Sequence, residues 1–358
     1  MRAIKLAVQI PGAVLALCVA MLPTAVGAAQ TADSAQRISF QIATGSSTGT
    51  YFPVGALLSE ILSHPPGVGR CENVNACGPA GLIVSTMASQ GSVANVISVN
   101  DGMINSGLAQ ADVVSLAMEG KGPFRKSCPA KSLRVIADLY GEDLHLVAAN
   151  RAKIEDVSQL RGKRVSLSPE GSGTIVTARA VLTAYGLSEK AIKANYDSPE
   201  QAIELLRSGK LDAFFLVGGT PIPLVEDLIA DGMAHLVPIT GPGLKRLLRD
   251  EPFLEPHLIP KGAYEHSPEV ETLSVDALWI TDQSQPERLI YGMLKALYNP
   301  ANRPALQSAR QGFHFIEPPF GPKLTPAPLH PGAARYFGEA GLLKAEQKET
   351  TARPVRKS

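Results

Sequence analysis

The sequence has few cysteines, few aromatic residues and no excess of either charge. Of its 358 residues, four are cysteine and 5% are aromatic, and the formal net charge is +1. No CxxC pair, HExxH motif or GxxxxGK(S/T) loop occurs, which argues against a metal or nucleotide-phosphate site. The scattered charges offer no basic surface to nucleic acid. We therefore expect no metal, no cofactor and no nucleic-acid partner.

Long hydrophobic runs are confined to the N-terminus. Arg2 and Lys5 precede an apolar stretch over residues 6–22, which Pro11 and Gly12 interrupt, and small residues follow at 26–29. This order predicts a cleaved export signal over residues 1–29. The alternative is a membrane anchor, but a spanning helix needs about 20 unbroken apolar residues.

What the sequence does contain is apolar bulk: 45% of its residues are hydrophobic and only 19% are charged. A chain of this length suits two lobes of about 100–200 residues each. Strand-like runs at 38–43, 82–84, 163–167 and 211–217 alternate with helical patterns at 55–63, 93–100, 175–185, 199–208 and 222–231. Two further extended runs, 133–140 and 144–148, are separated by Gly141, Glu142 and Asp143, and together they indicate the strand that leaves the first lobe. The alternation predicts an α/β fold with mostly parallel sheets.

Export would place three cysteines in an oxidising compartment. Cys71 and Cys77 flank a short polar loop, and Gly78 and Pro79 favour a turn after it. We predict a Cys71–Cys77 disulfide with Cys128 free. The alternatives are that Cys128 pairs with one of the others or that all three are reduced.

Four segments share one layout, in which a strand is followed by a Gly/Ser/Thr loop and then by a helix. They occur at residues 45–51, 89–92, 171–174 and 218–221. Ligands of open α/β sheets bind at the carboxyl ends of strands, and helix starts present free N–H groups that favour anions. Several such loops around one cleft would hold a carboxylate. Each loop taken singly is equally explained as an ordinary helix cap.

Residues 45–49 also match GxSxG, the nucleophile elbow of α/β-hydrolases. In that alternative Ser47 would be the nucleophile of a secreted serine hydrolase, with His330 and Asp276 as partners. The position after the first strand of the exported chain is unusual for an elbow, and nothing else in the sequence singles out the two partners.

An ordered set of strings resembles one family, the TAXI receptors of tripartite ATP-independent periplasmic (TRAP) transporters. The strings lie at residues 45–55, 91–95, 109–113, 120–124, 139–147, 160–166, 171–174, 211–215 and 328–337. Together they span roughly residues 38–340. Ser89 and Gln90 depart from the usual Thr-Gly, Gly141 stands where proline is usual, and the Cys71–Cys77 segment is an elaboration. The exact ligand is therefore not inherited.

The resemblance implies a type II periplasmic-binding-protein fold, with two lobes of mostly parallel sheets joined by a two-crossover hinge. Residues 30–140 would begin lobe 1, 141–235 form lobe 2, 236–340 return to lobe 1 with C-terminal helices, and 341–358 form a polar tail. It also implies a periplasmic, monomeric, non-enzymatic receptor that binds glutamate, a 2-oxoacid or a dicarboxylate and delivers it to an ion-coupled TRAP permease. The ligand contacts that the resemblance implies are Ser46, Ser47, Thr48, Tyr51, Ser92, Gln110, Ser172, Thr174 and Thr220. From the same four loops we add Gly45, Ser89, Gly173 and Gly219 as expected contacts.

Overall fold

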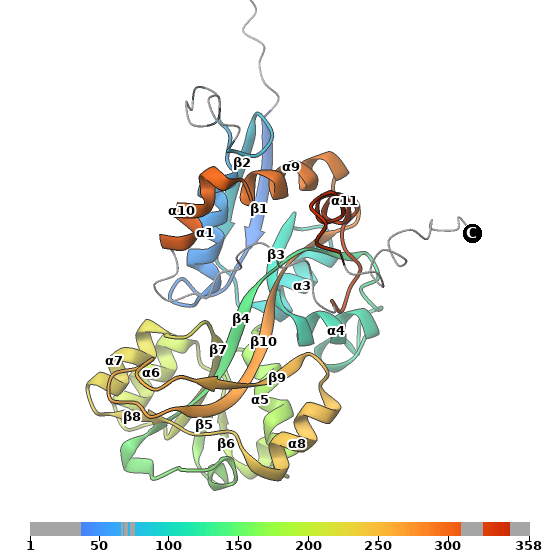
Figure 1. The fold of residues 1–358 in the computed structure, drawn as a ribbon. Coiled ribbons are helices and arrows are strands. Elements are labelled where there is room, and N and C mark those ends of the chain that lie inside the picture. The colour runs from blue at the N-terminus through green and yellow to red at the C-terminus, as the bar shows by residue number, and fades with distance from the viewer. Residues whose placement is uncertain (1–36, 66, 68–70, 72–75, 309–324, 344–358) are drawn as a thin grey trace, which may run out of the picture. The chain divides into compact units, whose positions relative to one another are not determined.

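The computed structural model describes residues 37–65, 67, 71, 76–308 and 325–343, all within one contact unit, Ala35–Ser358. The predicted signal peptide and residues 344–358 of the predicted tail lie outside the described residues. Within that unit the chain forms two α/β lobes (Figure 1).

Lobe 1 is built on three parallel strands in the order β2-β1-β3, covered by helices. The strands are β1 (Ile38–Ala43), β2 (Leu82–Met87) and β3 (Ser106–Gln110). The helices are α1 (Tyr51–Leu62), α3 (Ser92–Asn100), α4 (Ala111–Glu119), α9 (Glu287–Leu297), α10 (Arg303–Ser308) and α11 (Pro331–Glu339). Its core includes Trp279, fully buried and edge-on to Phe40 at 6.4 Å between ring centroids.

Lobe 2 repeats the design around the parallel strands β6-β5-β7. The strands are β5 (Arg164–Ser166), β6 (Lys193–Asn195), β7 (Ala213–Gly218), β8 (Ala234–Leu236) and β9 (Leu254–Ile259). The helices are α5 (Gly173–Ala184), α6 (Pro199–Arg207), α7 (Pro223–Ala230) and α8 (Gly241–Asp250). The strand β7 is buried along most of its length, as its continuous apolar sequence predicts.

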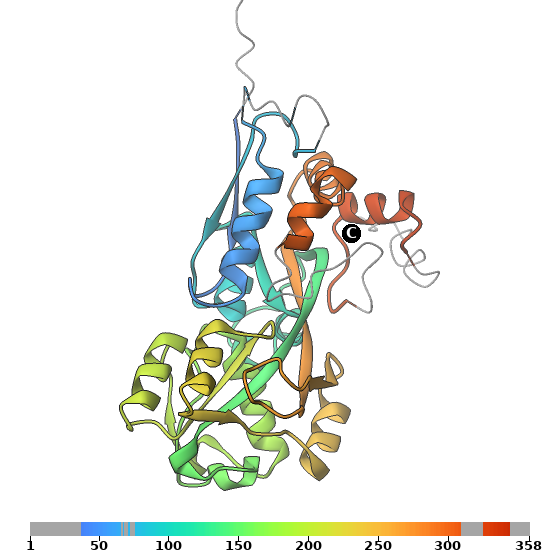
Figure 2. The same cartoon turned by 60° about the vertical axis from the view of Figure 1, so that its left-hand side comes forward.

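Two long antiparallel strands, β4 (Leu133–Ala149) and β10 (Val270–Asp282), run through both lobes side by side (Figures 1 and 2). β10 pairs with β3 in lobe 1 and with β9 in lobe 2, while β4 pairs with β7 and β8. The ten strands therefore form one continuous mixed sheet. The predicted two-lobed α/β architecture is confirmed.

The crossing strands differ from the sequence prediction in one detail, which is the point of return to lobe 1. The runs at 133–140 and 144–148 form the single strand that leaves lobe 1, as expected, because Gly141 continues the ladder opposite Asp276 of β10. The chain returns to lobe 1 along β10, and the elements α8 and β9, which follow the predicted boundary at residue 235, pack on α5 and pair with β10 in lobe 2.

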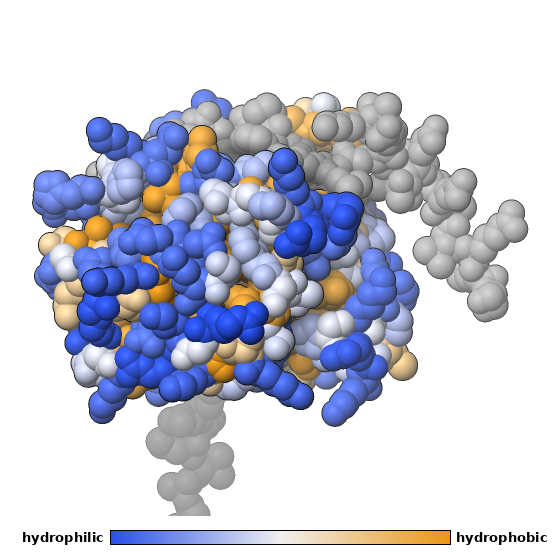
Figure 3. All heavy atoms as spheres, turned by 90° about the horizontal axis from the view of Figure 1, so that it is seen from below, coloured by the Kyte–Doolittle hydropathy of each residue, from blue (hydrophilic) through white to orange (hydrophobic). Residues whose placement is uncertain are grey.

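The Cys71–Cys77 disulfide is present, and Cys128 is an exposed free thiol. In the part of the chain that the structure describes, no helix combines the length and apolar character needed to cross a membrane. Seen from below, polar and charged residues cover most of the surface, with apolar residues in small groups between them (Figure 3).

Candidate functional site

A cavity of ≈ 180 Å³ lies between the two lobes, where four helices begin. Each helix contributes its N-cap residue and its first residue to the wall, two helices from each lobe. The pairs are Thr50 and Tyr51 of α1, Gly91 and Ser92 of α3, Ser172 and Gly173 of α5, and Ser198 and Pro199 of α6. Free N–H groups and the positive ends of four helix dipoles therefore surround one space, which suits a small anion.

Nine of the thirteen residues expected to contact a ligand line this cavity. They are Gly45, Ser46, Tyr51, Ser89, Ser92, Gln110, Ser172, Gly173 and Thr174. They come from three of the four loops selected in the sequence and from the end of β3. The structure thus brings them together, and their contact with a ligand stays a prediction.

The other four predicted contacts lie elsewhere. Ser47 and Thr48 are exposed on the turn before α1, and Gly219 is buried just after β7. Thr220 turns to a different polar cluster, where its hydroxyl donates to Asp143 Oδ2 at 2.5 Å and lies 3.2 Å from His145 Nε2. The loop before α7 therefore contacts the crossing strand β4 and does not contribute Gly219 or Thr220 to the cavity wall.

Asn95 of α3 fixes the lobe 1 side of the cavity. Its buried amide donates to the Thr44 carbonyl at 2.6 Å and to the Leu108 carbonyl at 2.7 Å, and its Oδ1 accepts from Ser89 at 2.7 Å. One side chain thus ties β1, β3 and the loop after β2 together. The result is a rigid position for Ser92, whose hydroxyl accepts from the Gln110 N–H at 3.1 Å.

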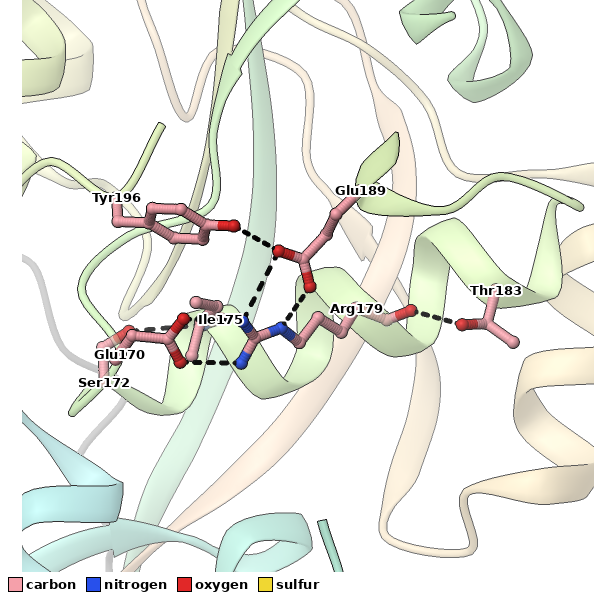
Figure 4. Close-up of polar contacts among 7 residues, drawn as sticks. All are labelled: Glu170, Ser172, Ile175, Arg179, Thr183, Glu189 and Tyr196. Atoms are coloured by element: carbon pink, nitrogen blue, oxygen red, sulfur yellow. Dashed lines mark hydrogen bonds and ion pairs between the residues drawn. The ribbon is translucent and has the colours of Figure 1, made fainter. Parts of the chain in front are cut away.

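On the lobe 2 side, two hydrogen bonds hold the start of α5 in place. Ser172 caps the helix by accepting from the Ile175 N–H at 3.2 Å, and Thr174 Oγ1 accepts from the Val217 N–H at 3.1 Å. Figure 4 shows Arg179, which lies further along α5 and forms ion pairs with both Glu170 and Glu189. The bridge to Glu170, at 2.7 Å, anchors the loop that leads into the cavity wall.

Glu142 is a cavity residue that the ligand-contact prediction missed. It lies in the middle of β4, is 2% exposed, and accepts a hydrogen bond from Thr50 Oγ1 at 3.1 Å. Burial raises the pKa of its carboxyl to about 8, against the lowering effect of the Tyr51 and Thr50 hydroxyls. Glu142 lies between the two extended runs in the sequence, and no local signal there indicates that it faces a cavity.

The start of α6 is the second missed feature. Ser198 forms a capping box with Gln201, a Ser-x-x-Gln signal that marks a helix start in the sequence itself. Glu200, in the first turn, accepts hydrogen bonds from Ser46 and Thr48 of lobe 1. Burial raises the pKa of Glu200, but the hydrogen bonds from Ser198, Ser46 and Thr48 outweigh it and lower the pKa to about 2.

The two lobes also touch at the rim of the cavity. The Ala94 N–H donates to the Gly171 carbonyl at 3.0 Å, and Gln110 Nε2 donates to Thr177 Oγ1 at 3.3 Å. At Gly173 a Cβ atom would lie 1.5 Å from Gln110 Oε1, so a larger residue fits there only if the Gln110 side chain moves. These contacts join lobe 1 to lobe 2 and describe a closed arrangement.

The geometry gives the hydrolase alternative little support. Both ring nitrogens of His330 are engaged, Nε2 with the Gln285 carbonyl at 3.0 Å and Nδ1 with the Gly332 N–H at 3.2 Å, so the ring acts as the cap of α11. Among the described residues, no group of three or more His, Cys, Asp or Glu side chains is placed to hold a metal ion. Glu142 is the one ionisable carboxyl on the cavity wall, and the described lining residues include no Lys, Arg or His.

Two α/β lobes joined by two crossing strands, with helix N-termini facing a shared cavity, define the fold of a periplasmic binding protein. Within that fold class the chain belongs to the NMT1-like family, whose model matches residues 42–341.

Several solved structures are similar to this chain. The alkanesulfonate-binding protein SsuA from Xanthomonas axonopodis pv. citri, bound to MOPS, has 15% identity and a TM-score of 0.41 over 90% of this chain and 86% of its own. The periplasmic aliphatic sulphonate-binding protein SsuA from Escherichia coli has 13% identity and a TM-score of 0.44 over 87% and 84%. PhnD1 from Prochlorococcus marinus, in complex with methylphosphonate, has 14% identity and a TM-score of 0.46 over 78% and 92%.

Proposed function

We propose that the protein is an extracytoplasmic solute-binding receptor that captures a small carboxylate and delivers it to a membrane permease. The observation that carries the proposal is the convergence of four helix N-termini on one cavity. Hydroxyl, amide and backbone N–H donors surround this space without a basic side chain among the described lining residues. Such a wall binds an anion by hydrogen bonds and helix dipoles.

The binding mechanism is closure of the two lobes around the ligand. The ligand first meets the loops of one lobe, and the helix starts of the other lobe then complete its hydrogen bonds. Closure excludes water and strengthens these bonds in a lower dielectric. The rim contacts between Ala94 and Gly171 and between Gln110 and Thr177 support this mechanism, because they form only when the lobes meet.

The finer assignment follows the TAXI resemblance. According to this assignment, the receptor is exported to the periplasm, acts as a monomer and delivers its ligand to an ion-coupled TRAP-type permease. The ligand is an amino acid such as glutamate, a 2-oxoacid or a dicarboxylate. The exposed surface of the closed lobes is what the permease recognises.

Thermal unfolding in the presence of candidate ligands tests the proposal. The panel contains amino acids, 2-oxoacids and dicarboxylates, with alkylsulfonates and phosphonates as other anions that helix N-termini accept. A true ligand at a hundredfold excess over its Kd stabilises the folded state by about 2.7 kcal/mol. We expect this from at least one carboxylate.

The serine hydrolase is the competing function, and a matched variant separates the two. Ser47→Ala leaves carboxylate binding unchanged if the protein is a receptor, because Ser47 is exposed and does not line the cavity. Ester cleavage by the wild type that disappears in Ser47→Ala, together with no stabilisation by any anion, would reject the receptor.

A further inference from the structure

Glu142 presents an unused carboxylate oxygen at the cavity. Its Oε1 accepts the 3.1 Å bond from Thr50, and the Tyr51 and Tyr140 hydroxyls lie close enough to influence the carboxyl, but Oε2 is buried and has no hydrogen bond of normal geometry among the described residues. Glu142 is 2% exposed and belongs to the cavity wall. A buried polar atom without a partner is unfavourable, so this oxygen is placed to bond something that enters the cavity.

None of the described residues that influence the pKa of Glu142 is a cation. The titratable groups among them are Tyr51 of α1, Asp112 of α4, and Tyr140 and Asp143 of β4. The carboxylate of Asp143 is paired with His257 on β9 at 2.6 Å. An ionised Glu142 would therefore add a negative charge beside the carboxyl groups of Asp112 and Asp143, and it would repel the anionic ligand that the four helix N-termini favour.

Protonation removes this conflict. Burial is the main cause that raises the pKa of Glu142 to about 8, and the charges of Asp112 and Asp143 act in the same direction. Near neutral pH the group is then mostly neutral and carries one O–H donor. A neutral carboxyl group completes a wall of donors, whereas an ionised one would repel an anionic ligand.

We propose that Glu142 binds the ligand as a protonated carboxyl group, with Oε2–H donating a hydrogen bond to an oxygen of an anionic ligand. This rests on the proposed receptor function and narrows its ligand to a dicarboxylate or a 2-oxoacid. An α-amino acid fits less well, because its ammonium group would require Glu142 to ionise. The ligand and Glu142 would share one proton, which makes affinity depend on pH.

Isothermal titration calorimetry of the full protein with succinate, 2-oxoglutarate and L-glutamate from pH 6.5 to 9.5 tests the inference. Anion affinity is constant while Glu142 is protonated and falls about tenfold per pH unit above its pKa. With that pKa at about 8, we expect succinate or 2-oxoglutarate to bind about 30-fold more weakly at pH 9.5 than at pH 6.5. L-Glutamate should be the weaker ligand.

Two variants assign the effect to Glu142. Glu142→Gln keeps an N–H donor without a titrating proton, so its anion affinity should be independent of pH and exceed that of the wild type at pH 9.5. Asp112→Asn is the control, because burial raises the pKa of Asp112 to about 7 but its carboxylate bonds Val113 and Thr177 outside the cavity wall. This variant should keep the wild-type decline, displaced to slightly lower pH because the Asp112 charge no longer raises the pKa of Glu142.

The pH dependence of anion affinity in the wild type can by itself overturn the inference, even if a variant fails to fold. Anion affinity that is independent of pH, or that rises with pH, contradicts it. A preference for L-glutamate that Glu142→Gln abolishes would instead show an ionised Glu142 paired with an ammonium group. Failure of all three compounds to bind at any pH would overturn the carboxylate receptor itself, and the inference with it.

Discussion

Tyr51 places its hydroxyl in the cavity, 3.3 Å from Ser92 Oγ, with its ring buried in the lobe 1 core. Tyr51→Phe removes one donor from the wall and keeps the packing. A single neutral hydrogen bond contributes about 0.5–1.5 kcal/mol, so ligand affinity should fall by about two- to tenfold. Calorimetric titration of the selected carboxylate measures this loss.

The matched control is Tyr185→Phe in lobe 2. The Tyr185 hydroxyl donates to the Thr240 carbonyl at 2.5 Å, away from the cavity lining. This variant should lower the melting temperature slightly and leave affinity unchanged. Equal affinity losses in the two variants would mean that Tyr51 acts through stability and does not touch the ligand.

Glu200 offers a second residue-scale prediction, because its carboxylate joins α6 to Ser46 and Thr48 across the cavity mouth. The contact is partly exposed, so Glu200→Ala should weaken ligand binding only about two- to fivefold at pH 7. The pKa of Glu200 is lowered from the ordinary 4.5 to about 2, so the contact contributes fully above about pH 4.5 and is lost as the pH falls toward 2.

The measurement is ligand affinity from pH 7 down to the lowest pH at which circular dichroism shows a folded protein. Wild type and Glu200→Ala should differ most at pH 7, and the two curves should converge at low pH. Curves that stay parallel would show that the Glu200 contact does not contribute to closure.

At the scale of elements, the first turn of α5 closes against lobe 1 because Gly173 has no side chain. Gly173→Ala would place a methyl group 1.5 Å from Gln110 Oε1 and 2.6 Å from Ser92 Oγ. The closed form is then disfavoured, because the Gln110 side chain must leave its position to make room, whereas the open form tolerates the methyl group. We expect at least about a hundredfold loss of affinity, equivalent to about 2.7 kcal/mol, with little change in unliganded stability.

Gly338→Ala in α11 is the matched control. A Cβ there meets its nearest neighbour, Leu343, at an ordinary 3.7 Å, so affinity and fold should be unaffected. If Gly173→Ala binds ligand as well as Gly338→Ala does, the contact between α5 and lobe 1 is not part of the bound state.

The elements of the lobes were predictable because their signals are local. The period of apolar residues and the glycines that end helices place α1, α3, α5 and α6 within a few residues of their observed bounds. The Gly/Ser/Thr loops likewise predicted three of the four helix starts at the cavity. Local signals of this kind need no knowledge of distant contacts.

The features that the sequence did not predict depend on contacts between segments that are far apart in the chain. Gly141 extends β4 only because β10, more than a hundred residues later, lies beside it, and this pairing is what buries Glu142 at the cavity. The loop before α7 has the same composition as the loops that line the cavity, yet Thr220 bonds Asp143 and His145. The segment before α6 contains no glycine, so the search for Gly/Ser/Thr loops did not identify Ser198 as a cavity residue.

For the whole molecule, the cavity between the lobes predicts a change of shape on binding. Small-angle scattering of the wild type should show a smaller radius of gyration when a carboxylate is bound. Gly173→Ala should keep the unliganded dimensions at the same ligand concentration. Unchanged dimensions of the wild type with a tightly bound ligand would contradict closure.

The continuous sheet through β4 and β10 has a consequence for how the protein melts. Each lobe contains part of the same two strands, so neither can lose its strands without stripping hydrogen-bond partners from the other. Heat should therefore denature the two halves in one calorimetric peak, with equal calorimetric and van't Hoff enthalpies. A substitution that destabilises one lobe should therefore destabilise the other as well. Proteases would then encounter either the folded protein or the fully unfolded chain, without a half-folded form between them.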